Sequence, residues 1–193
     1  MAYGLILGTA AGLSVGIILG VKRQLAGVLA PYVMVAFAIP NLALTPLFIL
    51  FFGIGMVSKV AIVTTVVFFF IFYNTFAGVR DVNPDLVNTV QIMGGSQLRV
   101  IRSVLLPSAT GWILTGLRLA LREALAAAVV GEIIAGNAGL GYLLAFSSGT
   151  FDATGVFAAL VFVALIAVAL NALAALTEQH LTRWKRSAAN EGG

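Results

Sequence analysis

Five stretches of this chain carry no charged residue and are long enough to cross a lipid bilayer. They cover residues 1–21, 24–58, 60–79, 133–151 and 153–177. About 20 apolar residues in a helix cross a hydrocarbon core of about 30 Å. The chain is 61% hydrophobic and only 9% charged, whereas a soluble domain is about 45–50% apolar. The runs therefore predict an all-α membrane protein, a polytopic helical bundle.

We predict about five spans, which cover residues 3–21, 25–52, 60–79, 110–134 and 154–177; the fourth contains charged residues. The second is too long for one perpendicular crossing and too short for two, so we expect Pro31, Pro40 and Pro46 to kink or interrupt it. A cleavable signal peptide would explain only the first charge-free run and leaves the other four unexplained.

Small residues recur at every fourth position in two of these spans. The first span carries Gly4, Gly8, Gly12, Gly16 and Gly20, and the fourth carries Gly116, Ala120, Ala124 and Ala128. Such stripes let helix backbones approach closely in lipid. We expect packing faces; a flexible or pore-lining hinge is the alternative for the first stripe.

The loop charges predict an orientation, because cytoplasmic loops of membrane proteins are enriched in Lys and Arg. Lys59 is alone on one side of the predicted bundle, and the other side carries Lys22, Arg23, Arg80, Arg99, Arg102, Arg183, Lys185 and Arg186. The second side is therefore assigned to the cytoplasm, which places the C-terminus inside and residues 135–153 outside. The N-terminus of the first span is then outside, so we expect an N-terminally short version of a six-span protein.

The composition disfavours several classes of function. No cysteine is present, which excludes disulfides, thiolate metal sites and a cysteine nucleophile. The basic residues are spread between spans and form no dense patch, so no nucleic-acid partner is expected. The phosphate-binding motif G-x-x-x-x-G-K-[ST] is absent, and His180, the only histidine, is expected at or beyond the membrane surface. We predict no catalytic residue and no metal site.

The longest polar insertion, residues 80–107, is expected to form two short amphipathic helices joined by a diglycine turn. Asn83 suits the N-cap and Pro84 the first position of the first helix, which Gly94 and Gly95 would end. Ser96 would cap the second helix and Pro107 would stop it. The apolar stripes are Leu86, Val87, Val90 and Met93 in the first helix, and Leu98, Ile101 and Leu105 in the second.

Three roles are open for this helix pair. A DNA-binding helix-turn-helix fits the pattern, but Arg99 and Arg102 are the only basic residues between Asp81 and Pro107, which disfavours it. The pair could cover the cytoplasmic end of the bundle. It could also be a rigid knob that docks on a soluble partner.

The same loop resembles a signature of permease subunits of binding-protein-dependent ABC importers. That signature is Glu-Ala-Ala, three residues, Gly, nine residues, Ile, any residue and Leu-Pro. Gly94, Val104, Leu106 and Pro107 fit its second part, whereas the Glu-Ala-Ala positions are occupied by Asn88, Thr89 and Val90. Residues 39–62, 72–87 and 116–144 are similar to the branch that imports nitrate, sulfonates, taurine or bicarbonate, and the resemblance covers residues 12–182.

The resemblance implies a transmembrane domain at 1–182, with a coupling loop at about 80–107 and a cytoplasmic tail at 183–193. It implies a second permease copy, cytoplasmic ATPase subunits that hold ATP and Mg, an extracytoplasmic solute-binding protein, and a location in the bacterial inner membrane. This chain itself would bind no cofactor. The residues expected to couple it to the ATPase are Asn88, Gly94, Gly95, Ser96, Leu98, Arg99 and Pro107.

Polar residues in and after the fourth span are candidates for the translocation pathway, because ionisable groups in lipid are costly. Arg118 and Arg122 lie on one helical face, and Glu132 and Asn137 lie near the outer end. Alternatively, the arginines pair with an acid or reach towards the cytoplasm. Residues 136–144 are either a glycine-rich loop or, as in the resembling family, a re-entrant turn or gate.

Three other functions compete with import of a small anion. A membrane-embedded enzyme would need a catalytic constellation, and none is visible. A membrane anchor or assembly subunit would lack the spacing from Gly94 to Pro107. An ABC permease for another solute class, such as a phosphonate, metal chelate or vitamin precursor, is the strongest alternative.

The predicted topology can be tested by cysteine labelling in intact cells. A cysteine introduced by Ser148→Cys should react with an impermeant thiol reagent, because residues 135–153 are predicted to be external. A cysteine introduced by Ser187→Cys should be protected until the cells are permeabilised. The reverse pattern would contradict the orientation.

Overall fold

The computed structural model describes the backbone of residues 1–181 and the side chains of residues 1–177. The His180 side chain and the tail 183–193 therefore lie outside the described residues. Every regular element in the described part is helical, which confirms the all-α prediction. In chain order these elements are α1 (Ala2–Val21), α2 (Arg23–Ala38), η1 (Asn41–Leu44), α3 (Thr45–Phe52), α4 (Met56–Arg80), α5 (Pro84–Ile92), α6 (Gln97–Val100), the π-helical η2 (Ile101–Leu105), α7 (Leu106–Ala135), α8 (Leu140–Gly149) and α9 (Ala153–Leu181).

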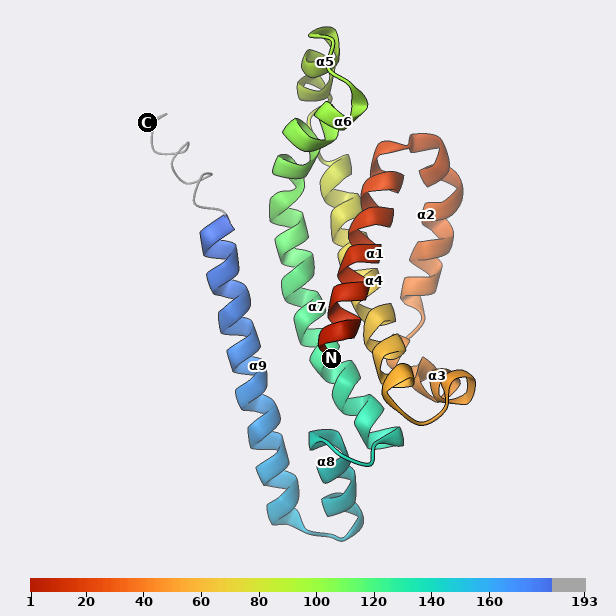
Figure 1. The fold of residues 1–193 in the computed structure, drawn as a ribbon, viewed down its shortest axis with the longest axis vertical. Coiled ribbons are helices and arrows are strands. Elements are labelled where there is room, and N and C mark those ends of the chain that lie inside the picture. Colours follow the sequence, from red (N-terminus) through yellow and green to blue (C-terminus); the bar gives the residue numbers. More distant parts are fainter. Residues whose placement is uncertain (182–193) are drawn as a thin grey trace.

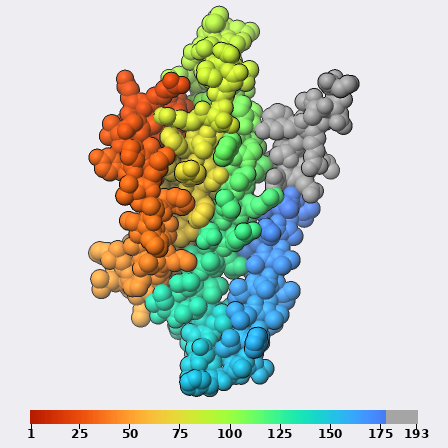
Figure 2. Space-filling view, turned by 180° about the vertical axis from the view of Figure 1, so that it is seen from behind, coloured from red at the N-terminus to blue at the C-terminus, as the bar shows by residue number. Residues whose placement is uncertain are grey.

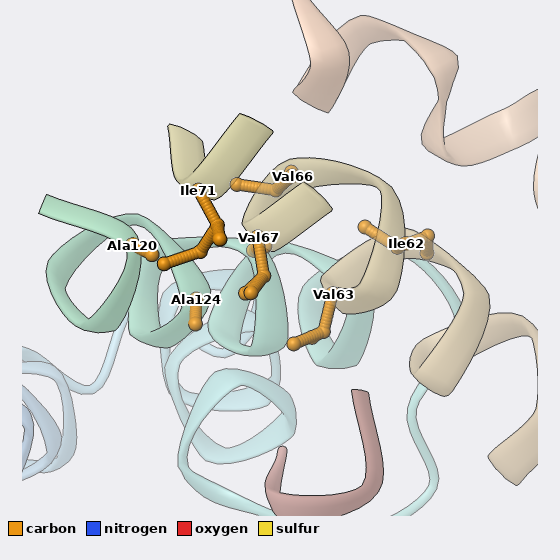
Figure 3. Close-up of a cluster of buried hydrophobic side chains, with 8 residues drawn as sticks. Ile62, Val63, Val66, Val67, Ile71, Ala120 and Ala124 are labelled. Carbon is orange, nitrogen blue, oxygen red and sulfur yellow. The ribbon is translucent and has the colours of Figure 1, made fainter. Parts of the chain in front are cut away.

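Helix α4 lies at the centre of the bundle, between α1 and α7 (Figure 1). Its branched side chains pack against alanines of α7 (Figure 3), in a cluster that contains Ile62, Val63, Val66, Val67, Ile71, Ala120, Ala124 and Ala127. All eight are at most 2% exposed. Because alanine adds only a methyl group, α7 approaches α4 closely and the branched side chains fill the space between them. The small-residue stripe predicted for α7 is thus a packing face, in which Gly116, Ala120 and Ala124 are buried and Ala128 is partly buried.

The glycine stripe of α1 packs on the other side of α4. A Cβ added to any of the five glycines would lie 2.6–2.8 Å from the nearest α4 atom. At Gly8 the nearest atoms are the carbonyl oxygen of Thr64 and Cβ of Val67, and at Gly16 the nearest is Cβ of Thr75. The two backbones therefore lie closer together than any larger residue allows, and the packing interpretation of the stripe is confirmed.

The second predicted span is broken. Helix α2 and the segment Asn41–Phe52 are bent by 81° relative to each other. The break falls at Ile39 and Pro40, Pro46 lies in the first turn of α3, and α2 continues through Pro31 without interruption. Of the three prolines, Pro40 is the one at the break.

Three described helices are long and apolar enough to cross a membrane: α1, α4 and Ala153–Thr177 of α9. The bent pair of α2 with Asn41–Phe52 brings the number to four if it forms one span. Helix α7 has 30 residues and contains the fourth predicted span, 110–134, but Arg118, Arg122, Glu123 and Glu132 make it more polar than these helices.

The second helix of the polar insertion is not a separate short helix, so that prediction is wrong. Helix α6, the π-helical turn η2 and α7 follow one another without a break from Gln97 to Ala135. Pro107 lies in the first turn of α7 instead of ending a helix. Its missing N–H costs little there, because η2 already departs from the α-helical hydrogen-bond pattern.

The bundle has two different ends (Figure 1). Helices α5 and α6, the turn from α1 to α2, and the last described turns of α9 lie towards one end, whereas α3 and α8 lie towards the other. Lys22, Arg23, Arg80, Arg99 and Arg102 thus lie towards the first end and Lys59 towards the other, as the charge pattern predicted; which end faces the cytoplasm stays a prediction. Helix α9 forms a ridge beside α7 (Figure 2), and only 6% of its span is buried within the chain.

The close approach of α1 and α4 can be tested with Gly8→Val. The larger side chain would collide with Thr64 and Val67, and overpacking of this kind costs about 1–3 kcal/mol. We expect a lower midpoint of unfolding in a denaturant titration of the detergent-solubilised protein.

Gly27→Val is the matched control, because Gly27 is also helical and an added Cβ would meet no atom within 4 Å. Equal destabilisation by both variants would contradict the packing role of the stripe.

Candidate functional site

The polar insertion begins with the capped helix α5. The side chain of Asn83 accepts a hydrogen bond from the backbone N–H of Asp85 at 2.8 Å, and Pro84 occupies the first helical position. This satisfies one of the free N–H groups at the start of the helix. The predicted start of the helix is confirmed.

The diglycine turn ends α5 and redirects the chain into α6. Gly94 has φ +77°, in the left-handed region that a β-branched residue adopts only with strain. The N–H of Gly95 donates to the carbonyl of Val90 at 2.9 Å, and a Cβ on Gly95 would lie 2.6 Å from that oxygen. Ser96 then caps α6, where its hydroxyl accepts a long 3.4 Å hydrogen bond from the N–H of Arg99.

The apolar residues of the loop divide into an inner and an outer set. Val87, Val90, Val100, Ile101 and Leu105 pack against Val79 and Ala109 at the end of the bundle. Ile92, Met93 and Leu98 surround the diglycine turn and are 86%, 78% and 55% exposed. We call these three residues the loop tip. Exposed apolar groups gathered in this way are typical of a surface that binds a partner.

The other predicted coupling residues lie around the tip. Asn88 and Arg99 are exposed on α5 and α6. Pro107 is half-buried at the start of α7, farther from the turn. The structure therefore brings Gly94, Gly95 and Leu98 together at one projecting end.

Sequence reasoning missed a contact that joins the two ends of the loop. The indole N–H of Trp112 on α7 donates to the carboxylate of Asp81, which follows α4, at 3.2 Å. A Cβ on Gly78 of α4 would lie 2.6 Å from Cβ of Trp112. Hence α4 and α7 are held together where the loop leaves the bundle. The sequence feature that could have indicated this contact is the position of a tryptophan near the end of a predicted span, where this residue is enriched.

Arg118 and Arg122 line one cleft of about 170 Å³ between α7 and α9. Leu125, Val168 and Asn171 also line it, so its walls are mainly apolar. The two arginines therefore share a face of α7, as their spacing predicted.

Glu132 has a different environment, ten residues or about 15 Å farther along α7. Its carboxylate accepts a hydrogen bond from the N–H of Gly141 at 2.9 Å and lies against Gly139, which has φ +114°. Asn137 is exposed in the intervening turn. The glycine-rich segment is thus a turn followed by α8, an element that the sequence analysis did not predict.

No group of three or more histidine, cysteine, aspartate or glutamate side chains that could hold a metal ion occurs within the described residues. The candidate site consists of a projecting loop and a cationic cleft.

Comparison with known proteins identifies the family of this chain. Residues 8–186 match the family described as binding-protein-dependent transport system inner membrane component. The chain is 33% identical over 186 residues to a putative aliphatic sulfonates transport permease protein of Bacillus subtilis, covering 96% of this chain and 67% of the relative. It is 38% identical over 165 residues to the riboflavin transport system permease protein of Chloroflexus aurantiacus, covering 86% and 62%.

Other comparisons agree with this family. The chain is 36% identical over 148 residues to the taurine transport system permease protein of Escherichia coli, covering 77% of this chain and 54% of that protein. It therefore spans roughly half to two thirds of the length of these three relatives. Among solved structures, a chain of the MetNI methionine ABC transporter in an inward-facing conformation has a TM-score of 0.80 at 20% identity, covering 93% of this chain and 89% of that chain. At that identity the likeness concerns the fold.

The matched family model extends over nearly all of the helical bundle, including the projecting loop and the α7–α9 cleft. The chain belongs to the inner-membrane components of binding-protein-dependent transport systems, as a permease of the ABC importer type similar to the sulfonate and taurine permeases.

Proposed function

We propose that this chain lines the translocation pathway of an ABC importer for a small anion and couples that pathway to a cytoplasmic ATPase subunit. The observation that carries the proposal is the loop tip, where Ile92, Met93 and Leu98 are exposed around a fixed turn at the end of the bundle. Apolar side chains on a rigid projection suit insertion into a cleft of a soluble partner.

The way the loop joins the bundle supports a mechanical role. Asp81 and Trp112 link the ends of α4 and α7, and Val100 and Leu105 are buried against the bundle. A displacement of the loop tip would therefore move both helices together. ATP and Mg would bind to the partner ATPase, whose closure supplies that displacement, and the permease would perform no chemistry.

The solute class is proposed from two kinds of support. Relatives of this chain are named for aliphatic sulfonates and taurine, and Arg118 and Arg122 give the α7–α9 cleft a cationic wall. A sulfonate is a permanent anion that such a wall would attract. A second candidate is an uncharged heterocycle, because the relative named for riboflavin is 38% identical to this chain.

The surface of the bundle supports the other proposed partners, which are lipid, a second permease copy and a solute-binding protein. Helix α9 has an apolar span that is almost wholly unburied within the chain, which suits contact with lipid and with a second permease copy. The end that carries α8 would face the extracytoplasmic solute-binding protein. The C-terminus would then be cytoplasmic, on the same side as the ATPase.

Coupling can be tested by measuring solute-stimulated ATP hydrolysis of the assembled importer. Leu98→Asp should reduce stimulation to the basal level, because a carboxylate buried unpaired in the partner's cleft is unfavourable. A loss of about 1.4 kcal/mol in docking would reduce association about tenfold. Gly94→Val should act similarly by straining the turn.

Two comparison variants make this test specific. Ser103→Asp adds the same charge at an exposed position outside the loop tip and should leave stimulation unchanged. Asn88→Ala should be mild, because Asn88 stands where related permeases have glutamate. A fully assembled and stimulated Leu98→Asp importer would rule out docking through the tip.

The pathway can be tested by uptake of labelled taurine into vesicles that hold the importer and its binding protein. Arg122→Gln should reduce uptake about tenfold if the cleft attracts the anion, which corresponds to about 1.4 kcal/mol. Glu132→Gln should reduce it less, because the amide oxygen can still accept the hydrogen bond from Gly141.

Arg102→Gln is the control, since Arg102 is exposed on the loop, away from the α7–α9 cleft. Wild-type uptake by both the Arg122 and the Glu132 variants would refute the pathway assignment. Uptake of riboflavin in place of taurine would favour the second candidate.

A further inference from the structure

A second cavity, of about 300 Å³, lies between the coupling loop and the ends of the bundle helices. Its walls come from the end of α1, the start of α2, the end of α4, and the inner faces of α5, α6 and η2. It is distinct from the α7–α9 cleft, with which it shares no lining residue. The proposed transport function makes no use of it.

The polar lining of this cavity suits an anion. Arg23 and Arg80 supply two guanidinium groups, and Asn88, Gln91 and Gln97 supply amide N–H donors. Among the described residues, no aspartate or glutamate lines it. Guanidinium and amide donors together form a site typical of phosphate recognition.

The neighbouring side chains leave these arginines available. The guanidinium of Arg80 lies 5.0 Å from the ring centre of Phe76, a contact that orients it while N–H donors remain for a ligand. Asp81, the adjacent carboxylate, is engaged by the indole N–H of Trp112. Within the described residues, neither Arg23 nor Arg80 forms an ion pair.

The apolar part of the cavity lining indicates the source of the phosphate. Gly20, Val21 and Val79 form an apolar wall at the ends of the spans α1 and α4, next to the arginines. A phospholipid presents this sequence of groups, with a charged headgroup above an apolar glycerol and acyl region. Basic pockets between helix ends at the membrane surface bind anionic headgroups in this manner.

We propose that this cavity binds the phosphate group of an anionic phospholipid, which is held by Arg23 and Arg80. The lipid would touch α5 and α6 on one side and the ends of α1 and α4 on the other. It would therefore brace the loop against the bundle, and the composition of the membrane would set how firmly the loop is held. The inference does not depend on which solute the importer carries.

Lipid retention tests the proposal directly. The full chain is placed in nanodiscs of equimolar phosphatidylcholine and phosphatidylglycerol, and the lipids that remain bound are counted by native mass spectrometry. We expect the wild type to retain phosphatidylglycerol in several-fold excess over phosphatidylcholine. Arg23→Gln/Arg80→Gln should retain the two lipids equally.

The control variant is Lys22→Gln/Arg102→Gln, which removes the same charge from the same end of the bundle at exposed positions outside the cavity. It should keep the wild-type preference. Circular dichroism of both double variants is measured as the control for folding, and we expect both to keep their helices. Equal lipid retention by the two double variants would overturn the site.

A second readout separates a lipid from free phosphate. Hydrogen exchange of residues 84–93 is compared in phosphatidylcholine nanodiscs, in the mixed nanodiscs, and in phosphatidylcholine nanodiscs with inorganic phosphate. Slower exchange in the mixed nanodiscs alone, lost in Arg23→Gln/Arg80→Gln, supports a lipid. Equal slowing by inorganic phosphate would overturn the lipid as the source, and no slowing in either case would overturn the anion site.

Discussion

The contact between α4 and its two neighbours is the constraint on which the rest of the bundle depends. In lipid the hydrophobic effect gives helices little reason to associate, so stability comes from close packing. Glycines of α1 and alanines of α7 provide it on two sides of α4, where residues such as Val63 and Val67 are buried. Because α4 is fixed along its length, the position of its last turn is fixed as well. The loop that follows α4 therefore leaves the bundle in a defined direction.

The loop is built as an extension of this packing. Buried valines on its inner side continue the core, and the hydrogen bond from Trp112 to Asp81 closes the gap between its two ends. The π-helical turn η2 lies inside the continuous helix that connects the loop to α7. Such turns are frequent at functional sites and allow local adjustment of a helix. The apolar tip is thus carried by helices that pack on the bundle, with one π-helical turn at their base.

The two cavities contain different pairs of arginines, and we propose different roles for the two pairs. The α7–α9 cleft holds Arg118 and Arg122 beside a helix that is almost unburied within the chain. The cavity under the loop holds Arg23 from the start of α2 and Arg80 from the end of α4, which are distant in sequence. A solute in the first cavity and a lipid phosphate in the second would bind at different positions along the bundle. Coupling to the ATPase would then depend on both the transported anion and the surrounding membrane.

The sequence by itself determined the elements that follow from local chemistry. Charge-free runs predicted α1, α4 and the apolar part of α9, the four-residue spacing of glycine predicted the packing face of α1, and Asn83, Pro84 and Gly94 predicted both ends of α5. These succeed because capping, left-handed turns and helical periodicity act within a few residues. Only the tertiary structure decided that Pro107 lies within a continuous helix instead of ending one, that Glu132 holds the turn before α8, and that Arg23 and Arg80 share a cavity. Those outcomes depend on which segments meet in space, because a proline is accepted where the preceding turn is already irregular and a charge acquires its role from neighbours many residues away.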